Sequence, residues 1–329
     1  MSKPRVGFLG VGWIGRHRMA AMLATGAVEA AAICDPSPEM IAQAQELAPE
    51  AAVMPSLDAM LGEGLDGIVI ASPSALHAAQ SIRALEAGAA VFCQKPLGRS
   101  AAEVRSVVAA ARAADRLLGV DMSYRFAAGM RRIATLIREG ALGRLFAIDL
   151  VFHNAYGPDK PWFYDRAQSG GGCLMDLGVH LIDLAFWATG TSDEPSDVHA
   201  TLLNGGGRVE PAGDAVEDFA LASFRLGDVA VRLACSWRLH AGRDAEISVA
   251  FYGTDGGAAL RNVGGSFYDF RAEQFSGTQA TTLCSPPDDW GGRAAADWGE
   301  RLAGGSRFDP MAEELIRSAA LIDRIYAAA

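Results

Sequence analysis

The sequence predicts an α/β protein with two domains, a doubly wound parallel sheet in residues 1–122 and an α+β domain with a large, mainly antiparallel open sheet in residues 123–329. Three observations favour this class. Short apolar runs alternate with amphipathic helical segments in the first part, and strand-like segments joined by tight turns dominate the second. A chain of 329 residues also exceeds the usual size of a single core.

Elements of the first domain follow one another in the order of a parallel sheet. Strands are expected at residues 5–10, 30–34, 66–72, 89–94 and 117–122, with helices at 13–25 and 38–47 and before each later strand. The run GIVIA, at 67–71, lacks polar alternation, which is typical of a strand buried on both faces.

The second domain begins where this alternation ends, after Met122. A helix is expected at 126–139, and strands at 145–154, 199–204, 219–226, 229–237, 245–253, 258–263 and 266–270. Turns such as Gly227-Asp228 and Gly256-Gly257 join neighbours as antiparallel hairpins. We expect a surface loop with one short helix at 284–310, then a last helix at 311–328 that could pack back toward the first domain.

Composition argues against several classes of protein. The net charge of −10 disfavours nucleic-acid binding, and the densest basic group, Arg131, Arg132 and Arg138, is typical of a solvated helix face. No signal-peptide pattern and no run of about 18 apolar residues is found, so neither secretion nor a membrane span is expected. Five scattered cysteines without CxxC spacing argue against a disulfide framework or a zinc site and favour the cytoplasm.

The motif GVGWIG follows the first expected strand and opens the first helix. In a dinucleotide-binding Rossmann domain, the first glycine permits a tight turn, the second lets the pyrophosphate approach the backbone and the third lets the helix pack on the strand. These roles fall on Gly10, Gly12 and Gly15, while Trp13 and Ile14 stand at the helix N-terminus, which attracts phosphate. The first domain is therefore expected to bind a dinucleotide.

Asp35 ends the second expected strand, 20 residues after Gly15. A carboxylate there can accept hydrogen bonds from the adenosine ribose and repels a 2′-phosphate, which favours NAD over NADP. Two alternatives stay open. Asp35 also suits the helix-entry turn Asp35-Pro36-Ser37-Pro38, and the nearby Arg16 could pair with a 2′-phosphate.

Polar residues follow two other strands at the carboxyl edge of the sheet, where ligands of doubly wound folds lie. Lys95 comes at the end of VFCQKP, and Pro96 suits a cis bond. Ser72, Pro73 and His77 occupy a strand-to-helix turn. Position alone decides neither role, because a surface lysine after a strand is common and His77 suits a helix cap or the surface better than catalysis.

The stretch SGGGCLMDLGVHLID, residues 169–183, runs three glycines into an apolar helix. That helix carries Asp176, His180 and Asp183 on one side. A capped core helix with an ion pair would explain the pattern, and so would a catalytic face whose glycines let the chain pass close to a ligand.

The segments GVGWIG, ASPSALHAAQSIRALEAGAAVFCQKPL and WFYDRAQSGGGCLMDLGVHLIDL together resemble the glucose–fructose oxidoreductase, inositol dehydrogenase and MocA (Gfo/Idh/MocA) family of NAD(P)-dependent oxidoreductases, over residues 5–270. The resemblance implies a Rossmann domain followed by a domain whose open sheet forms homodimer or homotetramer contacts. It also implies dehydrogenation of a sugar, a sugar derivative or an inositol-like polyol, with no nucleic-acid or membrane partner.

The resemblance implies a catalytic set of Lys95, Asp176 and His180. The family's Glu-Lys-Pro motif falls on Gln94, Lys95 and Pro96, its Gly-Gly-Gly…Asp-x-Gly-x-His motif on Gly170–Gly172, Asp176, Gly178 and His180, and its tryptophan on Trp162. Two positions depart from the pattern: Gln94 replaces the glutamate and cannot form an ion pair, and Phe163 stands where an arginine often follows the tryptophan.

Site residues are expected in both domains. Cofactor contacts are expected from Gly10, Gly12, Trp13, Ile14, Gly15, Asp35, Ser72, Pro73, His77, Gln94 and Lys95, and substrate contacts from Lys95, Arg125, Tyr156, Trp162, Asp176 and His180. Asp159, Lys160 and Tyr164 lie in the same loop as Tyr156 and Trp162, and such a mixture of aromatic and polar residues suits a hydroxyl-rich ligand. The same residues could instead pin the loop to the surface.

Oxidation of a secondary hydroxyl or lactol needs a base for the hydroxyl proton while hydride leaves for NAD. His180 suits this role because the usual imidazole pKa is about 6.5. Asp176, four residues earlier, can hold the tautomer of His180, and Lys95 can stabilise the developing alkoxide. Asp183 could join His180, contact the substrate or make an interdomain contact. No metal is expected.

Two other functions stay open at this point. One is a family member that uses NAD transiently to cleave a glycoside, and the other is a non-catalytic NAD-binding sensor. The presence of Lys95, Asp176 and His180 counts against the sensor, which needs a nucleotide site but no proton relay.

Overall fold

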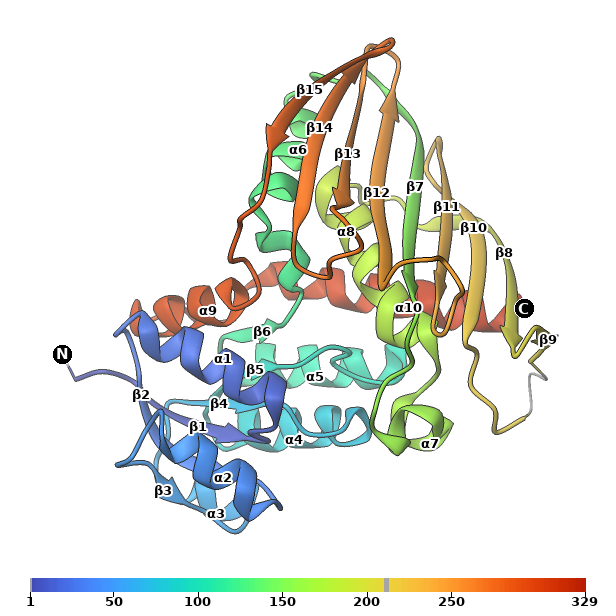
Figure 1. The fold of residues 1–329 in the computed structure, drawn as a ribbon. Helices are drawn as coiled ribbons and strands as arrows, with labels where there is room; N and C mark the ends of the chain where they lie inside the picture. The colour runs from blue at the N-terminus through green and yellow to red at the C-terminus, as the bar shows by residue number, and fades with distance from the viewer. Residues whose placement is uncertain (1, 210–212) are drawn as a thin grey trace. The chain divides into compact units, whose positions relative to one another are not determined.

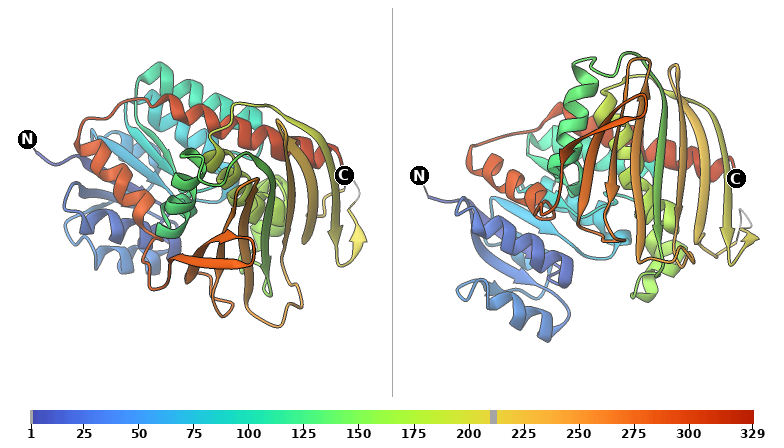
Figure 2. Two further views of the ribbon diagram at one scale, coloured as in Figure 1. Left: turned by 90° about the horizontal axis from the view of Figure 1, so that it is seen from above. Right: turned by 45° about the horizontal axis from the view of Figure 1, so that its top comes forward.

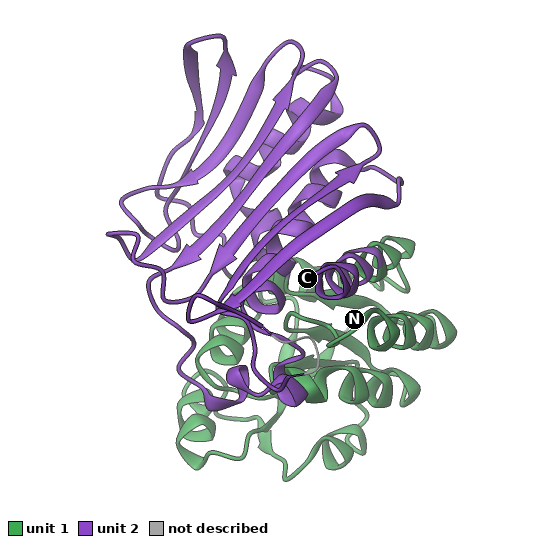
Figure 3. Ribbon diagram, turned by 90° about the vertical axis from the view of Figure 1, so that its right-hand side faces the viewer, with its two compact units in different colours: residues 1–121, 292–316 green, residues 122–291, 317–329 purple. Residues whose placement is uncertain are grey.

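The computed structural model describes residues 2–209 and 213–329, which form two compact units (Figure 3). Unit 1 comprises Met1–Asp121 and Gly292–Ile316, and unit 2 comprises Met122–Gly291 and Arg317–Ala329. The first division therefore falls one residue before the expected one, and unit 1 also includes a second segment from late in the chain.

Unit 1 is built around a parallel sheet (Figure 1). Its strands are β1 (Arg5–Leu9), β2 (Glu29–Cys34), β3 (Ala52–Val53), β4 (Gly67–Ile70), β5 (Ala90–Cys93) and β6 (Leu118–Val120), in the order β3-β2-β1-β4-β5-β6. Its helices are α1 (Trp13–Ala24), α2 (Pro38–Gln45), α3 (Leu57–Leu61), α4 (Ser74–Glu86), α5 (Ala101–Ala114), α9 (Arg293–Ala303) and the 3₁₀ turn η4 (Pro310–Glu313). This is the predicted doubly wound fold, with its topological switch between β1 and β4.

Apolar strands without polar alternation occupy the centre of this sheet. Every residue of β4 and β5 is buried, including Ile68, Ile70 and Phe92. The prediction from the GIVIA run is therefore confirmed. The short β3 and α3 had not been predicted, because two strand residues and five helical residues are too few to show a period.

Helix α9 belongs to unit 1 although residues 122–291 separate it from the rest of that unit. Its Trp298 packs on two strand glycines, since a Cβ atom built at Gly67 or Gly119 would lie 2.6 Å from the indole. The ring of Phe92 completes the contact, at a centroid distance of 5.9 Å. The predicted short helix within 284–310 is thus a core element of the first unit.

Unit 2 contains a nine-stranded sheet within the described residues. Its strands are β7 (Leu145–Asn154), β8 (Pro195–Asn204), β9 (Gly207–Arg208), β10 (Phe219–Leu226), β11 (Val229–Ser236), β12 (Ala245–Gly253), β13 (Gly257–Asn262), β14 (Phe270–Ser276) and β15 (Gln279–Cys284), in the order β15-β14-β13-β12-β7-β11-β10-β8-β9. Only β7 and β11 pair in parallel there, so the predicted mainly antiparallel sheet is confirmed.

Helices cover one face of this sheet (Figure 2). The helical elements of unit 2 are η1 (Ser123–Phe126), α6 (Ala128–Arg138), η2 (Pro161–Tyr164), α7 (Arg166–Ser169), the π-helix η3 (Leu174–Gly178), α8 (Val179–Thr189) and α10 (Glu314–Ala327), of which α10 joins unit 2 from residue 317. Buried and exposed residues alternate along β10 and β11, as expected for a sheet with one open face.

The predicted strand at 266–270 is wrong except for its last residue. Residues 266–269 form a turn, in which the Ser266 hydroxyl accepts hydrogen bonds from the N–H groups of Tyr268 and Asp269, both at 3.1 Å. β14 begins only at Phe270. Side-chain-to-backbone bonds of this kind compete with strand pairing, and an aromatic-rich segment does not reveal them.

The helical run Arg166–Thr189 is long and apolar enough to match a membrane span by length and composition. However, 89% of its apolar window is buried within the protein, as in the core helix of a soluble protein.

Candidate active site

In the glycine-rich turn of unit 1, contacts with protein atoms are sufficient to require glycine at two positions. Gly10 has a φ of +83°, and a Cβ there would lie 2.6 Å from the carbonyl oxygen of Ala71. A Cβ at Gly15 would lie 2.1 Å from the carbonyl oxygen of Gly10. The tight turn and the approach of α1 to β1 therefore exclude any side chain at these positions.

Gly12 differs from both, because a Cβ there would meet no heavy atom of the described residues within 4 Å. Packing therefore does not require glycine at this position, whereas a ligand lying against the backbone would. Helix α1 starts directly after Gly12, which has no side chain to cap it, so the N–H groups of Trp13 and Ile14 lie in the first turn at the positive end of the helix. These features fit a pyrophosphate group.

Asp35 fixes the backbone around this turn. Its Oδ2 accepts a hydrogen bond from the N–H of Val11 and its Oδ1 from that of Ser37, both at 2.8 Å. The helix-entry role that had stayed open is therefore real. Each carboxylate oxygen retains a second lone pair, so the ribose role is compatible with it. Arg16 lies close by, with its Nη1 3.9 Å from the sulfur of Met40.

His77 joins two of the turns at the carboxyl edge of the sheet. Its Nδ1 lies 2.7 Å from the carbonyl oxygen of Pro96, and its Nε2 lies 2.7 Å from that of Ser72. The ring is buried, and burial lowers its pKa. Rather than lying at the surface, His77 lies buried between the turn at Ser72 and Pro73 and the turn that carries Lys95, and the neutral ring can donate a hydrogen bond to one of the two carbonyl oxygens.

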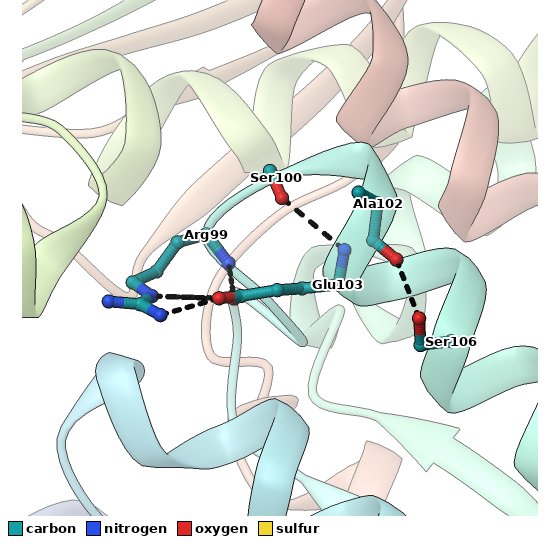
Figure 4. A network of polar contacts seen from close by, with 5 residues as sticks. All are labelled: Arg99, Ser100, Ala102, Glu103 and Ser106. Carbon is teal, nitrogen blue, oxygen red and sulfur yellow. Dashed lines mark hydrogen bonds and ion pairs between the residues drawn. The ribbon is translucent and has the colours of Figure 1, made fainter.

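The segment that carries Lys95 is anchored at both ends. Before it, the amide of Gln94 donates to the Oδ2 of Asp121 at 2.8 Å, and the Lys95–Pro96 peptide bond is cis. After it, the carboxylate of Glu103 accepts from the N–H of Arg99 at 2.7 Å and pairs with the Arg99 guanidinium, while the Ser100 hydroxyl caps α5 (Figure 4). The loop between β5 and α5 is thus held by its flanks.

In unit 2, the helix expected after the three glycines begins as a π-helix. Asp176 lies in this π segment and His180 in α8, which continues it. Asp176 is partly exposed, whereas His180 is 8% exposed and Asp183 only 1%. Single π turns inside α-helices are frequent at functional sites, and no residue pattern in the sequence distinguishes one from an α turn.

A buried glutamate organises the start of this helix. Glu217 accepts hydrogen bonds from the N–H groups of Gly172 and Leu174, at 3.0 and 2.9 Å, and from the hydroxyl of Tyr326 at 2.9 Å. Burial raises the pKa of Glu217. A Cβ at Gly171 would lie 1.9 Å from the Tyr326 hydroxyl, and one at Gly172 would lie 1.9 Å from the Glu217 carbonyl oxygen. Protein atoms, not a ligand, therefore require these two glycines.

Two aromatic side chains contact the predicted catalytic pair. The indole N–H of Trp237, directly after β11, donates to the Oδ2 of Asp176 at 3.1 Å. The ring of Tyr124 meets that of His180 edge-on, at a centroid distance of 4.9 Å. Both aromatic residues are buried, so they fix the positions of Asp176 and His180 on the helix.

Asp183 forms an ion pair with Arg125. The guanidinium donates through Nε and Nη2 to the two carboxylate oxygens, at 2.7 and 2.5 Å. Both residues belong to unit 2, so this pair is not the interdomain contact that had been considered for Asp183. A two-point pair of this kind orients η1 against α8.

Comparison with known proteins identifies the chain. Residues 4–122 match the model described as oxidoreductase family, NAD-binding Rossmann fold, and residues 130–259 match the GFO/IDH/MocA C-terminal domain. The chain belongs to the Gfo/Idh/MocA family. It is an NAD(P)-dependent sugar dehydrogenase of that family, with NAD favoured as its cofactor.

Relatives of this family member include two curated proteins. D-glucoside 3-dehydrogenase of Escherichia coli (strain K12) is 29% identical over 272 residues, which cover 78% of this chain and 76% of that protein. 1,5-anhydro-D-fructose reductase of Ensifer adhaerens is 30% identical over 214 residues, which cover 63% of this chain and 61% of that protein. A solved structure of levoglucosan dehydrogenase with NADH and levoglucosan has a TM-score of 0.84 at 21% identity, covering 99% of this chain and 97% of that one.

The loop before the glycines in this family member makes polar contacts both within itself and with the segment before β12. The Tyr156 hydroxyl donates to Asp244 at 2.6 Å, the Tyr164 hydroxyl donates to the carbonyl of Pro158 at 2.9 Å, and Lys160 pairs with Asp159 at the surface. Tyr156 and Tyr164 therefore help to hold the loop, whereas the exposed pair of chain neighbours Asp159 and Lys160 does not. Trp162 stacks on Phe163 at 3.8 Å and forms the aromatic part of the loop.

Among the residues that sequence reasoning missed, Glu217, Trp237 and Tyr326 hold the helix start that carries Asp176. None stands in a motif, and each is far along the chain from the residues it contacts.

Among the described residues, no group of three or more His, Cys, Asp or Glu side chains is placed to hold a metal ion.

Proposed function

We propose that this enzyme oxidises a secondary hydroxyl or lactol of a sugar, sugar derivative or inositol-like polyol, with His180 as the general base. The observation that carries the proposal is the rigid start of the helix that bears Asp176 and His180. Trp237 donates a hydrogen bond to Asp176, Tyr124 packs on His180, and the Glu217 carboxylate accepts hydrogen bonds from the N–H groups of Gly172 and Leu174. Such support is typical of a site that must hold reacting groups in place.

The cofactor would lie along the carboxyl edge of the sheet in unit 1. Gly12 and the first turn of α1 would hold the pyrophosphate, and Asp35 the adenosine ribose. The turns at Ser72 and Lys95, which have His77 buried between them, would line the rest of the nucleotide. When bound, NAD supplies the hydride acceptor.

The protein's own groups would handle the proton and the charge. His180 takes the hydroxyl proton on its imidazole, and Asp176 orients the ring and stabilises the imidazolium. Lys95 donates a hydrogen bond to the oxygen that becomes negative. Trp237 supports this set by fixing the carboxylate of Asp176, which otherwise could turn away.

A hydroxyl-rich substrate is supported by two features. The two curated relatives and the solved structure all have names that refer to sugars or their anhydro derivatives. The stacked pair Trp162 and Phe163 offers an aromatic surface of the kind that packs on sugar C–H groups.

We further propose that the enzyme works in the cytoplasm as a homodimer or homotetramer formed through the open face of the unit 2 sheet.

A substrate panel tests the proposal. Purified protein is mixed with aldoses, 1,6-anhydrosugars, alkyl glucosides, uronates and inositols, and reduced nucleotide is followed at its absorbance band, with NAD and NADP in parallel. We expect turnover with at least one compound and a preference for NAD, because Asp35 opposes a 2′-phosphate. Absence of turnover across the panel, with nucleotide binding intact, would count against oxidation of a hydroxyl or lactol in these substrate classes.

A further inference from the structure

A buried ion pair with an amide beside it connects three elements of unit 1. The Nε of Arg18, on α1, lies 2.6 Å from the Oδ2 of Asp121, directly after β6. The amide of Gln94, directly after β5, donates to the same oxygen at 2.8 Å. Arg18 is 6% exposed, Asp121 2% and Gln94 7%, so this network is shielded from water.

Two members of the network lie on elements that carry parts of the predicted site. Arg18 lies on the helix whose N-terminus faces the expected nucleotide, and Gln94 precedes Lys95. The N–H of Asp121 also donates to the carbonyl of Cys93 at 3.0 Å, which continues the pairing of β5 and β6 past their ends. The network therefore fixes the backbone immediately before Lys95 relative to α1.

The charges of Arg18 and Asp121 favour a neutral residue, such as glutamine, at position 94. One guanidinium balances one carboxylate, and the second oxygen of Asp121, Oδ1, is buried without a hydrogen-bond partner among the described residues. A glutamate at 94 would place a second carboxylate within hydrogen-bonding distance of the first, where two negative charges cannot both be accommodated by a single arginine. Gln94 instead contributes a donor.

We propose that Arg18, Asp121 and Gln94 position Lys95 by tying the ends of β5 and β6 to α1, and that the network accepts a single buried carboxylate, carried here by residue 121 rather than 94. The part of this inference that concerns Lys95 rests on the proposed dehydrogenase function. Gln94 and Asp121 are thus positioning residues.

The test compares Gln94→Glu, Asp121→Asn and the double variant Gln94→Glu/Asp121→Asn with the wild-type enzyme. Thermal unfolding without ligand, NADH affinity by fluorescence, and kcat and KM are measured from about pH 6 to about pH 9. Around position 94 the ionisable groups are His17 and Arg18 from α1, Asp121 after β6, His77 from α4, and Cys93 and Lys95 beside it in the chain. Burial raises the pKa of the Cys93 thiol to about 12, so it stays neutral in this range.

The single variant Gln94→Glu is expected to show a loss of stability and kcat at high pH that the wild type does not show. When protonated, the carboxyl group introduced at position 94 can donate to Asp121 in place of the amide, so its folded-state pKa rises above the unfolded value. The stability of this variant should therefore be closest to that of the wild type at the low end of the range and fall as pH rises toward that pKa, since the loss begins above the unfolded value of about 4.3. Its kcat should fall as the group ionises in the folded enzyme and be at least about tenfold below that of the wild type at the high end. Affinity for NADH is measured in parallel because Gln94 is also an expected cofactor contact.

The double variant restores one carboxylate and one guanidinium, so it should lose the pH-dependent defect and recover most of kcat. Asp121→Asn alone leaves Arg18 buried without its counter-charge, so it should unfold at lower temperature at every pH. If Gln94→Glu follows the wild-type pH profile, or if the double variant is no better than either single one, the proposal is wrong. Unfolding needs no substrate, so it decides the charge requirement even if the wild type turns nothing over. A wild-type enzyme that turns over no substrate would instead refute the proposed function, and with it the role of Lys95.

Discussion

Replacing His180 by alanine is expected to lower kcat by a factor of about 10² to 10⁴, because the hydroxyl proton then has no positioned acceptor. Lys95→Ala should cause a loss of about 10² to 10³, the usual effect of removing a donor that stabilises a developing oxyanion. Affinity for NADH, measured by fluorescence titration, should stay close to that of the wild type in the His180 variant. Steady-state rates with an active sugar from the panel provide the measurement.

Matched controls come from exposed residues of the same types. His199 lies exposed on β8 and Lys3 lies exposed near the N-terminus, so alanine at either position should leave kcat unchanged. Near-native turnover in both His180→Ala and Lys95→Ala would show that the catalytic set is wrong. A fall in melting temperature that accompanies the loss of kcat in the His180 variant would instead indicate a structural role.

Gly172→Ala should be the most damaging small substitution in unit 2. The added Cβ would lie 1.9 Å from the carbonyl oxygen of Glu217, and backbone atoms on both sides must then move. We expect a destabilisation of about 3 kcal/mol, seen as a melting temperature lower by several degrees. The same shift would misplace the π-helix that carries Asp176, so kcat should fall as well.

Gly207→Ala serves as the control, because its Cβ would meet the nearest described atom, the carbonyl oxygen of Asn204, at an ordinary 3.6 Å. Its melting temperature should match the wild type within about 1 °C, as for most surface substitutions. Equal melting temperatures for Gly172→Ala and the wild type would contradict the role assigned to the contact with Glu217.

Local sequence patterns predicted most of the fold because the pattern and the structure it reports lie in the same segment. β7, β10 and β12 have the predicted bounds, and the glycine turn between β1 and α1 follows its motif. The sequence placed α9 in a surface loop of the second domain, because its packing partners in unit 1, Gly67, Phe92 and Gly119, are distant in the chain.

For the candidate site too, the sequence predicted the residues that stand in motifs but not the residues that contact them. The motifs indicated Asp176 and His180, but the residues that hold them come from other elements without a motif: Trp237 after β11, Glu217 before β10 and Tyr326 near the C-terminus. The partner of Asp183 illustrates the same limit, since Arg125 is 58 residues away and nothing in the sequence couples the two. Pairings across the fold depend on tertiary structure, which one sequence does not encode in a readable pattern.

Deuterium transfer tests the central claim most directly. The enzyme is given NAD and an active sugar deuterated at the oxidised carbon, and the reduced nucleotide is examined by mass spectrometry and NMR. We predict one deuterium at C4 of the nicotinamide for each sugar oxidised, at a rate that collapses in His180→Ala. Unlabelled reduced nucleotide, or sugar consumed without any net reduced nucleotide, would contradict hydride transfer from the hydroxyl-bearing carbon of a sugar to NAD as the reaction of this enzyme.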